Sequence, residues 1–375
     1  MPVAEISAKS ILRKQKRVDS WFISFCGMNL YRGCTHNCAY CDGRHEKYNV
    51  NGVFERDIEV KINAPELLKK ELDPSRKSAP LGKGFVLLGG GVNDSYQPVE
   101  KKYEITRQAL KILAEYGYPV HILTKSVLIK RDFDLIQKIN KKTKALVSFS
   151  ISSTDDNISK VFEPGASLPS ERLETLSYFR RNGINGGIFY MPVIPFVTDT
   201  PKIMDKTLSD IKSAGAQYIV SSGMTLKSGK QKEHFFKILS NYNSSLIPSY
   251  NNVYKENIYG SATSGYYNSL NKTLLSLNKI HKIPLRIPLS LFSDILNEND
   301  RISVILDQLD YLLKLKGQSS LYGFASYSIS QLKHPVSEIA DLRQIKGVGP
   351  VTEKLIREII ITGTCNYYEK EMAIK

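Results

Sequence analysis

Between Met28 and Ser222 the chain alternates short β-branched or apolar runs with longer stretches of helical periodicity. This alternation is typical of consecutive βα units, in which a crossover helix connects each parallel strand to the next. We predict six strands, at Asn29–Gly33, Phe85–Gly89, Val120–Thr124, Ala145–Ser152, Gly187–Val193 and Tyr218–Ser222. Their order indicates an α/β fold of the barrel type built on a parallel sheet.

Helices are predicted between these strands and after them. Val99–Tyr116 forms one helix that closes at Gly117. Another begins after the capping hydroxyl of Thr200, with Pro201 at its first position and Gly215 beyond its end. Further helical patterning is expected at Lys230–Ser240, Leu270–His281, Arg301–Lys316 and Ile329–Glu358, with a loop region at Asn241–Ser269.

Prolines and polar residues interrupt the helical patterns between Pro284 and Asn299, and we place a domain boundary there. The expected organisation is a basic N-terminal segment (1–19), a barrel domain with an extension (20–284) and a small C-terminal α-helical domain (285–375).

The chain is strongly basic, with 52 Lys and Arg residues against 37 Asp and Glu and a net charge of +15. Its 42% hydrophobic content is ordinary for a folded protein and excludes a disordered chain. Because a basic surface attracts polyanions through counterion release, nucleic acid is the first partner to consider; solubility in a lysine-rich proteome is the alternative. No apolar run is long enough to span a membrane and Met1–Ile11 lacks the centre of a secretory signal, so we expect a cytoplasmic protein without a membrane partner.

Three of the five cysteines, Cys34, Cys38 and Cys41, crowd into one loop after the first predicted strand. An odd number at this spacing argues against a disulfide framework. Three thiolates on one loop can hold three irons of a [4Fe–4S] cluster and leave the fourth iron open. A closed zinc site, with His36 or His45 as fourth ligand, is the alternative.

Two further features follow predicted strands. Gly89, Gly90 and Gly91 come directly after the second strand, where they let the backbone approach a ligand closely or form a simple turn. Lys125 ends the third strand, as a ligand-binding cation or a solvated charge. In the fourth strand, period-two alternation sends Ser148, Ser150 and Ser152 to one face, which points inward in a barrel, where they bind a ligand or satisfy one another.

The C-x₃-C-x-aromatic-C pattern of Cys34, Cys38, Tyr40 and Cys41 resembles that of the radical S-adenosylmethionine (SAM) superfamily. The resemblance implies a partial (β/α)₆ barrel of the TIM type, with a [4Fe–4S] cluster on the three cysteines and SAM bound to the open iron. It also implies an electron donor such as flavodoxin or ferredoxin. One electron then cleaves SAM to a 5′-deoxyadenosyl radical, and the glycine run holds the SAM amino group.

A narrower resemblance, to the spore photoproduct lyase family and related DNA-repair-lyase-like proteins, covers about residues 33–196. It rests on the cysteine loop and on Gly91–Pro98, Leu123–Ser126, Phe162–Gly165 and Met191–Pro195. It implies lyase-type DNA repair or modification and a SAM site made of Tyr40, Gly89, Gly90, Gly91, Asn93, Lys125, Ser148 and Ser150.

The sequence departs from that family at two positions. Gly91 stands where the lyases carry a hydrogen-donating cysteine, and Asp42 stands where they carry a tyrosine. A substitute hydrogen donor is then needed, for which Cys26 and Cys365 are candidates, although each is expected to be an inert buried thiol. We name Cys26 and Tyr40 as candidate catalytic residues.

The segment Ile345–Leu355 resembles a helix-hairpin-helix motif. In such a motif Gly347 and Gly349 expose backbone N–H groups to a phosphate at the start of the second helix, and Lys346 adds a charge. A helical hairpin that merely packs on the barrel is the alternative.

Together these features predict a radical SAM enzyme that abstracts hydrogen from nucleic acid, with DNA favoured over RNA. Two alternatives stay open. One is a radical SAM enzyme that acts on a small molecule or a peptide, and the other is a non-enzymatic, metal-containing nucleic-acid-binding module.

Overall fold

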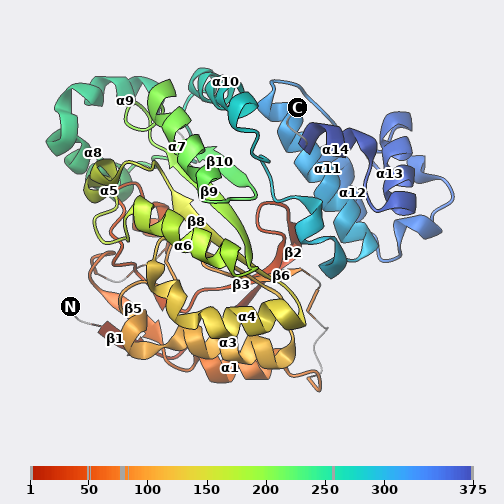
Figure 1. Cartoon of the computed structure of the whole chain (residues 1–375), viewed down its shortest axis with the longest axis horizontal. Coiled ribbons are helices and arrows are strands. Elements are labelled where there is room, and N and C mark those ends of the chain that lie inside the picture. The colour runs from red at the N-terminus through yellow and green to blue at the C-terminus, as the bar shows by residue number, and fades with distance from the viewer. Residues whose placement is uncertain are drawn as a thin grey trace.

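A seven-stranded sheet curls into an open half-barrel at the centre of the molecule (Figure 1). The computed structural model describes residues 3–48, 50, 52–76, 81–82, 84–255 and 258–372. The strands, in spatial order, are β10 (Ile219–Gly223), β9 (Asn185–Val193), β8 (Ala145–Ile151), β7 (Val120–Thr124), β6 (Phe85–Leu88), β3 (Ser24–Met28) and β2 (Leu12–Asp19). All neighbours pair in parallel except β2, which is antiparallel to β3. The predicted α/β half-barrel is confirmed.

The first predicted strand, Asn29–Gly33, is wrong in position. The barrel strand is β3, and the chain then leaves the barrel to form β4 (Tyr31–Arg32) in a second sheet of order β1 (Val3–Ile6), β5 (Ile58–Lys61) and β4. The chain leaves the barrel sheet here because Tyr31 is held elsewhere. Its ring is fully buried, and its hydroxyl donates to the buried Glu100 carboxylate. The N-terminal residues therefore extend both sheets, through β1 and β2; residues 1 and 2 lie outside the described part.

Helices cover the outer side of the half-barrel (Figure 1). They are α1 (Ala64–Leu72), α2 (Glu100–Tyr103), α3 (Ile105–Tyr116), α4 (Phe133–Lys142), α5 (Asp156–Phe162), α6 (Pro169–Arg181) and α7 (Pro201–Ser213). Gly117 closes α3 at φ +73°, and the Thr200 hydroxyl caps α7 by accepting from Ile203 N at 3.4 Å, as predicted. The single helix predicted for Val99–Tyr116 is wrong, because Glu104 adopts φ +51° and separates α2 from α3.

Beyond β10 the chain adds α8 (Lys230–Asn243), α9 (Ile247–Val253) and α10 (Ser264–His281). The loop predicted at Asn241–Ser269 is therefore partly wrong; of its residues, 256 and 257 lie outside the described part. The sequence there has no clean period because aromatic packing holds the segment. Tyr250 stacks with Tyr254 at a centroid distance of 5.9 Å and contacts Phe235 at 5.2 Å.

Four helices form the C-terminal part: α11 (Glu298–Leu315), α12 (Tyr322–Ser330), α13 (Pro350–Thr362) and α14 (Asn366–Met372). The helical stretch predicted at Ile329–Glu358 is wrong between α12 and α13, where the chain makes only two 3₁₀ turns, Val336–Glu338 and Leu342–Gln344. Pro335 and Gly347, at φ +85°, break the helical path. Residues 373–375 lie outside the described part.

Helix α11 closes the open side of the half-barrel (Figure 1). Its Tyr311 hydroxyl donates to Ser221 O of β10 at 3.4 Å, and its Asp307 pairs with Arg17 of β2 at 3.4 Å. The helix thus touches both edge strands, and 11 of its 18 residues are buried. Within the described residues, no helix combines the length and apolarity that a bilayer crossing requires.

His121 of β7 is fully buried in a chain of hydrogen bonds. Its Nδ1 lies 2.9 Å from Phe22 O, and its Nε2 lies 2.8 Å from Ser148 Oγ, which is 2.8 Å from the Tyr218 hydroxyl. A carbonyl only accepts, so Nδ1 donates to Phe22 and Nε2 accepts from Ser148, whose oxygen accepts from Tyr218. This arrangement holds the imidazole neutral.

Burial lowers the pKa of His121 from an ordinary value of 6.5 to about 4. Between these values the unfolded chain binds more protons than the folded chain, so the free energy of unfolding falls as the pH decreases from about 6.5 to about 4.5. We expect His121 to account for a loss of about 2–3 kcal/mol across that window, measured by urea denaturation at each pH. His121→Gln cannot titrate and should reduce this slope; His234, whose pKa burial also lowers, and carboxylates with lowered pKa values, such as Asp94 and Glu163, supply the remainder. An undiminished slope would contradict the assignment.

Candidate functional site

A cavity of about 360 Å³ lies at the carboxyl ends of the barrel strands. Parallel strands of a barrel meet at this edge, where loops from successive βα units converge. The cavity is lined by the cysteine loop, the glycine run after β6, Lys125 after β7, Ser150 on β8, and Met191 and Pro192 on β9. Five strand ends and the cysteine loop thus surround one space, because residues 222–225 at the end of β10 complete its wall.

The cysteine loop is anchored on one side by the segments around Phe54 and Gln97. Cys34 N donates to Phe54 O at 3.0 Å, and Thr35 N donates to Gln97 Oε1 at 3.0 Å, while Gln97 Nε2 donates to Gly33 O at 3.2 Å. Gly33 adopts φ +74°, and a Cβ there would lie 2.9 Å from Phe54 O. Only glycine allows the sharp turn that starts the loop.

The Phe162–Gly165 segment holds the other side of the loop. Ala39 N donates to Phe162 O at 2.8 Å, and Gly165 N donates to His36 O at 2.9 Å. A Cβ on Gly165 would lie 2.0 Å from Thr35 O, so the two backbones pack together only because residue 165 has no side chain. The loop is therefore fixed before any ligand binds.

His36 and Asp94 tie the cysteine loop to β7. His36 Nδ1 donates to Gly165 O at 3.0 Å, and its Nε2 lies 3.2 Å from Asp94 Oδ2. Asp94 also accepts from Lys125 N and from the Thr124 hydroxyl, both at 2.7 Å. Burial alone would raise the pKa of Asp94, but His36 and these donors outweigh it and lower the pKa. His36 Nδ1 is engaged by Gly165 O, whereas Nε2, which makes no hydrogen bond among the described residues, faces the Asp94 carboxylate.

A buried ionic network supports the cavity wall around Tyr40. Glu163 accepts from Arg172 Nη2 at 2.5 Å, from Lys125 Nζ at 3.3 Å and from the Tyr40 hydroxyl. Burial alone would raise the pKa of Glu163, but the charges of Arg172 and Lys125 hold it well below its usual range. Lys125 Nζ also donates to Ser150 Oγ at 2.7 Å and lies 5.7 Å from the centroid of the Tyr40 ring.

Comparison with known proteins identifies this arrangement. The radical SAM superfamily matches residues 28–207. Uncharacterized protein Rv2578c of Mycobacterium tuberculosis is 30% identical over 262 residues, which cover 68% of this chain and 74% of that protein. The chain belongs to the radical SAM superfamily. A radical SAM Nalpha-GlyT isomerase of Pseudomonas phage M6 is also similar, with 26% identity over 164 residues that cover 43% of this chain and 32% of the isomerase.

The radical SAM half-barrel is similar to solved structures of spore photoproduct lyase. A mutant of that enzyme with dinucleoside spore photoproduct has a TM-score of 0.56 at 15% identity, covering 74% of this chain and 79% of the other. A double mutant with bound AdoMet and dinucleoside spore photoproduct has a TM-score of 0.53 at 17% identity, covering 72% and 78%. At these identities the likeness establishes the fold. The cofactors of the superfamily, and so of this enzyme, are a [4Fe–4S] cluster and SAM, and a reductant is required.

The three cysteines fit a cluster. Cys34, Cys38 and Cys41 line the same cavity, and burial raises the pKa of each thiol, that of Cys38 to about 12, so that metal binding has to displace the protons. Within the described ranges, no three His, Cys, Asp or Glu side chains converge to hold one metal ion. A cubane does not need such convergence, because each thiolate binds a different iron.

Most residues predicted for SAM line this radical SAM cavity: Tyr40, Gly90, Gly91, Asn93, Lys125 and Ser150. Asn93 Nδ2 donates to Tyr31 O at 2.9 Å, whereas the buried Asn93 Oδ1 has no hydrogen-bond partner in the described part of the chain. Oδ1 is therefore an acceptor left for a ligand. Ser150 Oγ donates to Met191 O at 3.0 Å and accepts from Lys125, so its hydroxyl is already engaged.

Two residues predicted for SAM do not line the cavity. The Ser148 hydroxyl is fully buried between His121 and Tyr218, which satisfy it. Gly89 adopts φ +85°, and a Cβ there would lie 2.1 Å from Leu123 O. Gly89 thus lets the end of β6 pass close to β7, a structural role rather than a ligand contact.

Cys26, a candidate catalytic residue of the sequence analysis, is not among the residues that line the cavity. It lies on β3 in the hydrophobic core, 2% exposed, and does not line the cavity. Burial raises its pKa to about 11, so it is an inert thiol. Cys365 follows α13 in the chain, is buried, and does not line the cavity either.

The predicted hairpin residues lie at the start of α13 and do not line the cavity. Gly347 packs against α12, where a Cβ would meet Phe324 Cδ1 at 2.7 Å, and no atom lies within 4 Å of a Cβ built on Gly349. Lys346 is exposed. A short 3₁₀ turn, rather than a helix, precedes these residues.

Sequence reasoning missed three residues of the site. Glu163 lies in a motif that the sequence singled out, but its place as the partner of Arg172 and Lys125 has no local signal. Arg172 is an ordinary position in a helical pattern, yet it is fully buried. Trp21, from the turn between β2 and β3, lines the cavity from a segment that carries no motif.

Proposed function

We propose that this radical SAM enzyme acts on nucleic acid, with DNA favoured, in a lyase-like repair or modification reaction that begins by removing a hydrogen atom from the substrate. The observation that carries the proposal is the single cavity in which three cysteines face the glycine run and Lys125, on a half-barrel similar to that of spore photoproduct lyase. The net charge of +15 supports a polyanionic substrate.

In this proposal Cys34, Cys38 and Cys41 hold the [4Fe–4S] cluster. SAM occupies the rest of the cavity, against Tyr40, Gly90, Gly91, Asn93, Lys125 and Ser150. When bound and reduced, the cluster supplies one electron to SAM and so provides the radical that attacks the substrate.

The chain's own side chains orient SAM. Asn93 Oδ1 is the free acceptor that suits the SAM amino group, and backbone at Gly90 and Gly91 allows close approach. Lys125 presents a cation toward the SAM carboxylate while Glu163 and Ser150 fix its direction. Glu163 also fixes the Tyr40 ring, which lies against the adenosyl group.

Lyase chemistry requires a hydrogen atom for the product radical. In the described part of the chain, the cluster cysteines are the only cysteines that line the cavity. Tyr40 therefore remains the proposed catalytic residue, because it lines the cavity and its hydroxyl is held by Glu163.

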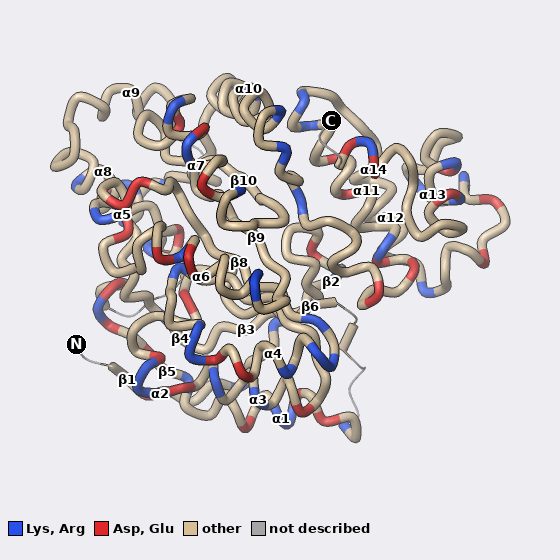
Figure 2. Tube along the Cα trace, viewed as in Figure 1, with Lys and Arg blue, Asp and Glu red and all other residues tan. Residues whose placement is uncertain are grey.

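The proposed contacts outside the cavity are electrostatic. Figure 2 shows Lys and Arg distributed over the whole molecule, with acidic residues among them on the C-terminal helices. Gly347, Gly349 and Lys346 are proposed to contact a phosphate in the manner of a helix-hairpin-helix, which adds affinity without base specificity. Flavodoxin or ferredoxin is the proposed electron donor.

The test uses reconstituted, reduced protein with SAM and either irradiated or unirradiated DNA that carries deuterium. We expect deuterium to appear in 5′-deoxyadenosine with one of the two DNAs. Transfer from neither DNA, together with active cleavage of SAM, would overturn the substrate class and favour a small molecule or a peptide.

A further inference from the structure

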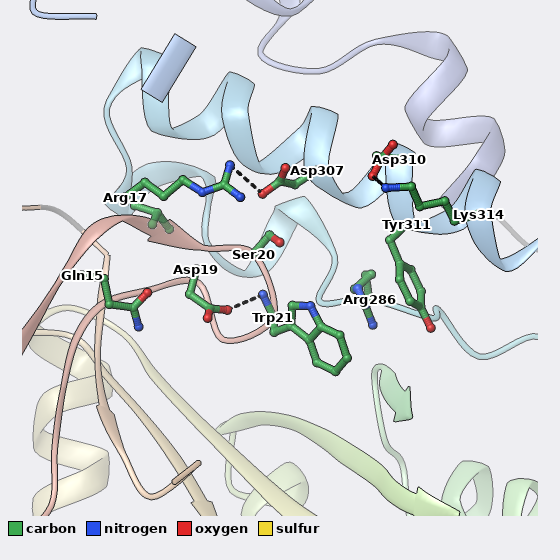
Figure 3. A pocket seen from close by; sticks show the side chains of 11 residues that line it. Gln15, Arg17, Asp19, Ser20, Trp21, Arg286, Asp307, Asp310, Tyr311 and Lys314 are labelled. Atoms are coloured by element: carbon green, nitrogen blue, oxygen red, sulfur yellow. Dashed lines mark hydrogen bonds and ion pairs between the residues drawn. The ribbon is translucent and has the colours of Figure 1, made fainter. Parts of the chain in front are cut away.

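A second cavity, of about 370 Å³, lies on the open side of the half-barrel (Figure 3). Its walls come from β2 and the turn that follows it, from the segment before α11, and from α11 itself. Arg286 and Tyr311 face Trp21 across this space in Figure 3. Arg286 does not line the cofactor cavity, so its guanidinium has no role in the site described above.

Arg286 is buried, and one nitrogen of its guanidinium has no hydrogen-bond partner among the described residues. Its residue exposure is 1%, and its Nη1 makes one long hydrogen bond, 3.4 Å to Leu285 O. Its Nη2 is buried and has no hydrogen-bond partner in the described ranges. A guanidinium carries five N–H donors, and burying a charge without an acceptor is strongly unfavourable.

Two aromatic rings hold the guanidinium in place. Its central carbon lies 4.4 Å from the Trp21 ring centroid and 3.2 Å from that of Tyr311. Stacking of this kind fixes the plane of the guanidinium and leaves its edge, which carries the N–H donors, for a ligand. Arg286 is thus oriented in advance of binding.

The acidic residues of this cavity make their short contacts with groups other than Arg286, although Asp19 is near enough to interact with it electrostatically. Asp307 pairs with Arg17 at 3.4 Å and Asp310 pairs with Lys314 at 2.6 Å, while Asp19 Oδ1 accepts from Trp21 N at 2.7 Å. No carboxylate of the described residues lies within ion-pair distance of Arg286. An anionic ligand would supply the counter-charge at contact distance that the described residues do not provide.

Trp21 connects this cavity with the cofactor cavity, because its side chain belongs to the lining of both. Only the Trp21 indole therefore separates a group held by Arg286 from the space assigned to the cluster and SAM. A substrate that reaches both sides of Trp21 would contact both cavities at once.

We infer that Arg286 binds a phosphate group of the nucleic-acid substrate and so positions the reacting nucleotide toward the cofactor cavity. This inference rests on the proposed function. A planar guanidinium fork matches two phosphate oxygens with parallel hydrogen bonds, which gives both charge and direction. Because the contact is to the backbone, it positions any sequence equally.

The test measures binding of a DNA dinucleotide with one phosphodiester to the reconstituted protein, by equilibrium dialysis. Trp21 is the only tryptophan of the chain and lines both cavities, so a change in its emission reports a ligand in either, and loss of that change in Arg286→Gln assigns the ligand to this cavity. We expect Arg286→Gln to weaken binding roughly 10- to 100-fold and to remove the emission change. Arg286→Lys keeps the positive charge but loses the planar guanidinium. Its affinity for the dinucleotide should lie between those of the natural protein and Arg286→Gln.

Arg181→Gln is the matched control, because it removes an exposed arginine of α6 that has no part in either cavity.

The ligand controls test the phosphate itself. A dinucleotide with an uncharged methylphosphonate link should bind to the natural protein as weakly as the phosphodiester dinucleotide binds to Arg286→Gln. Acetate that binds as tightly as the dinucleotide would overturn phosphate as the ligand class. Inorganic phosphate separates a simple anion from a nucleotide: we expect it to bind at Arg286 but more weakly than the dinucleotide, and equal binding would overturn nucleic-acid recognition here.

The two proposals fail in different ways. If Arg286→Gln folds with an unchanged melting temperature and binds the dinucleotide like the natural protein, the Arg286 inference is wrong whatever the enzyme does to DNA. If binding depends on Arg286 but no nucleic acid yields deuterium in 5′-deoxyadenosine, the proposed reaction is wrong while the phosphate contact stands.

Discussion

Replacement of Cys38 by alanine is expected to leave the protein without a complete [4Fe–4S] cluster and to reduce SAM cleavage by at least roughly 100-fold. Loss of an outer-shell partner of a metal site already costs about 10- to 100-fold, and a thiolate that holds an iron contributes more. Cys38 is 7% exposed and no other cysteine outside its loop lines the cavity in the described residues, so nothing replaces it. Iron and sulfide per chain after anaerobic reconstitution, and 5′-deoxyadenosine formed, measure the effect.

Cys26→Ala and Cys365→Ala are the matched controls, because both remove a buried thiol that is absent from the cavity lining. Each should retain about four irons per chain and SAM cleavage close to that of the natural protein. A Cys38→Ala protein with full iron content would refute the ligand assignment. One zinc per chain in the natural protein, without turnover, would refute the enzyme.

Replacement of Glu163 by glutamine is expected to destabilise the protein by about 3–5 kcal/mol, the usual cost of breaking a buried ion pair by removing one partner. Glutamine keeps the size of the side chain but leaves the fully buried Arg172 and the nearly buried Lys125 without their shared counter-charge. The Tyr40 hydroxyl loses its carboxylate acceptor at the same time. Urea denaturation measures the change in free energy of unfolding.

Lys206→Ala tests whether any ion pair would give the same result. Lys206 is paired with Asp210 at 2.7 Å, but its side chain is 68% exposed, so its loss should cost less than about 0.5 kcal/mol. If Glu163→Gln costs no more than this control, the network around Tyr40 contributes no net stability and our account of it is wrong.

The order of the fold was predictable because it rests on local pattern. The apolar runs from Phe85 onward became β6 to β10, since strands buried on both faces leave a clear signature. The first strand was displaced because Ser24–Met28 contains a polar residue, a cysteine and a glycine, whereas its neighbour Tyr31 is drawn to a distant partner, Glu100. Contacts between residues far apart in the chain leave no local period.

The site divides in the same way. The cysteine loop, the glycine run and Lys125 follow strand ends, so topology alone brings them to one cavity. Ser148 and Ser150 occupy equivalent positions in the alternating pattern of the strand. Ser148 nevertheless binds His121 and Tyr218, whereas Ser150 lines the cavity, and the sequence pattern does not distinguish the two roles. Arg172 and Arg286 are found only from the structure, because burial of a charge depends on everything packed around it.

The closure of the sheet by α11 limits what can be excised from this protein. The region recognisable by family, 28–207, omits both edge strands, β2 and β10, and the helix that touches them. Such a fragment would expose unpaired strand edges and the apolar surface that α11 covers. Both promote aggregation. Biochemical work on the enzyme therefore needs the chain from β2 through α11, although no motif of its chemistry lies at either end.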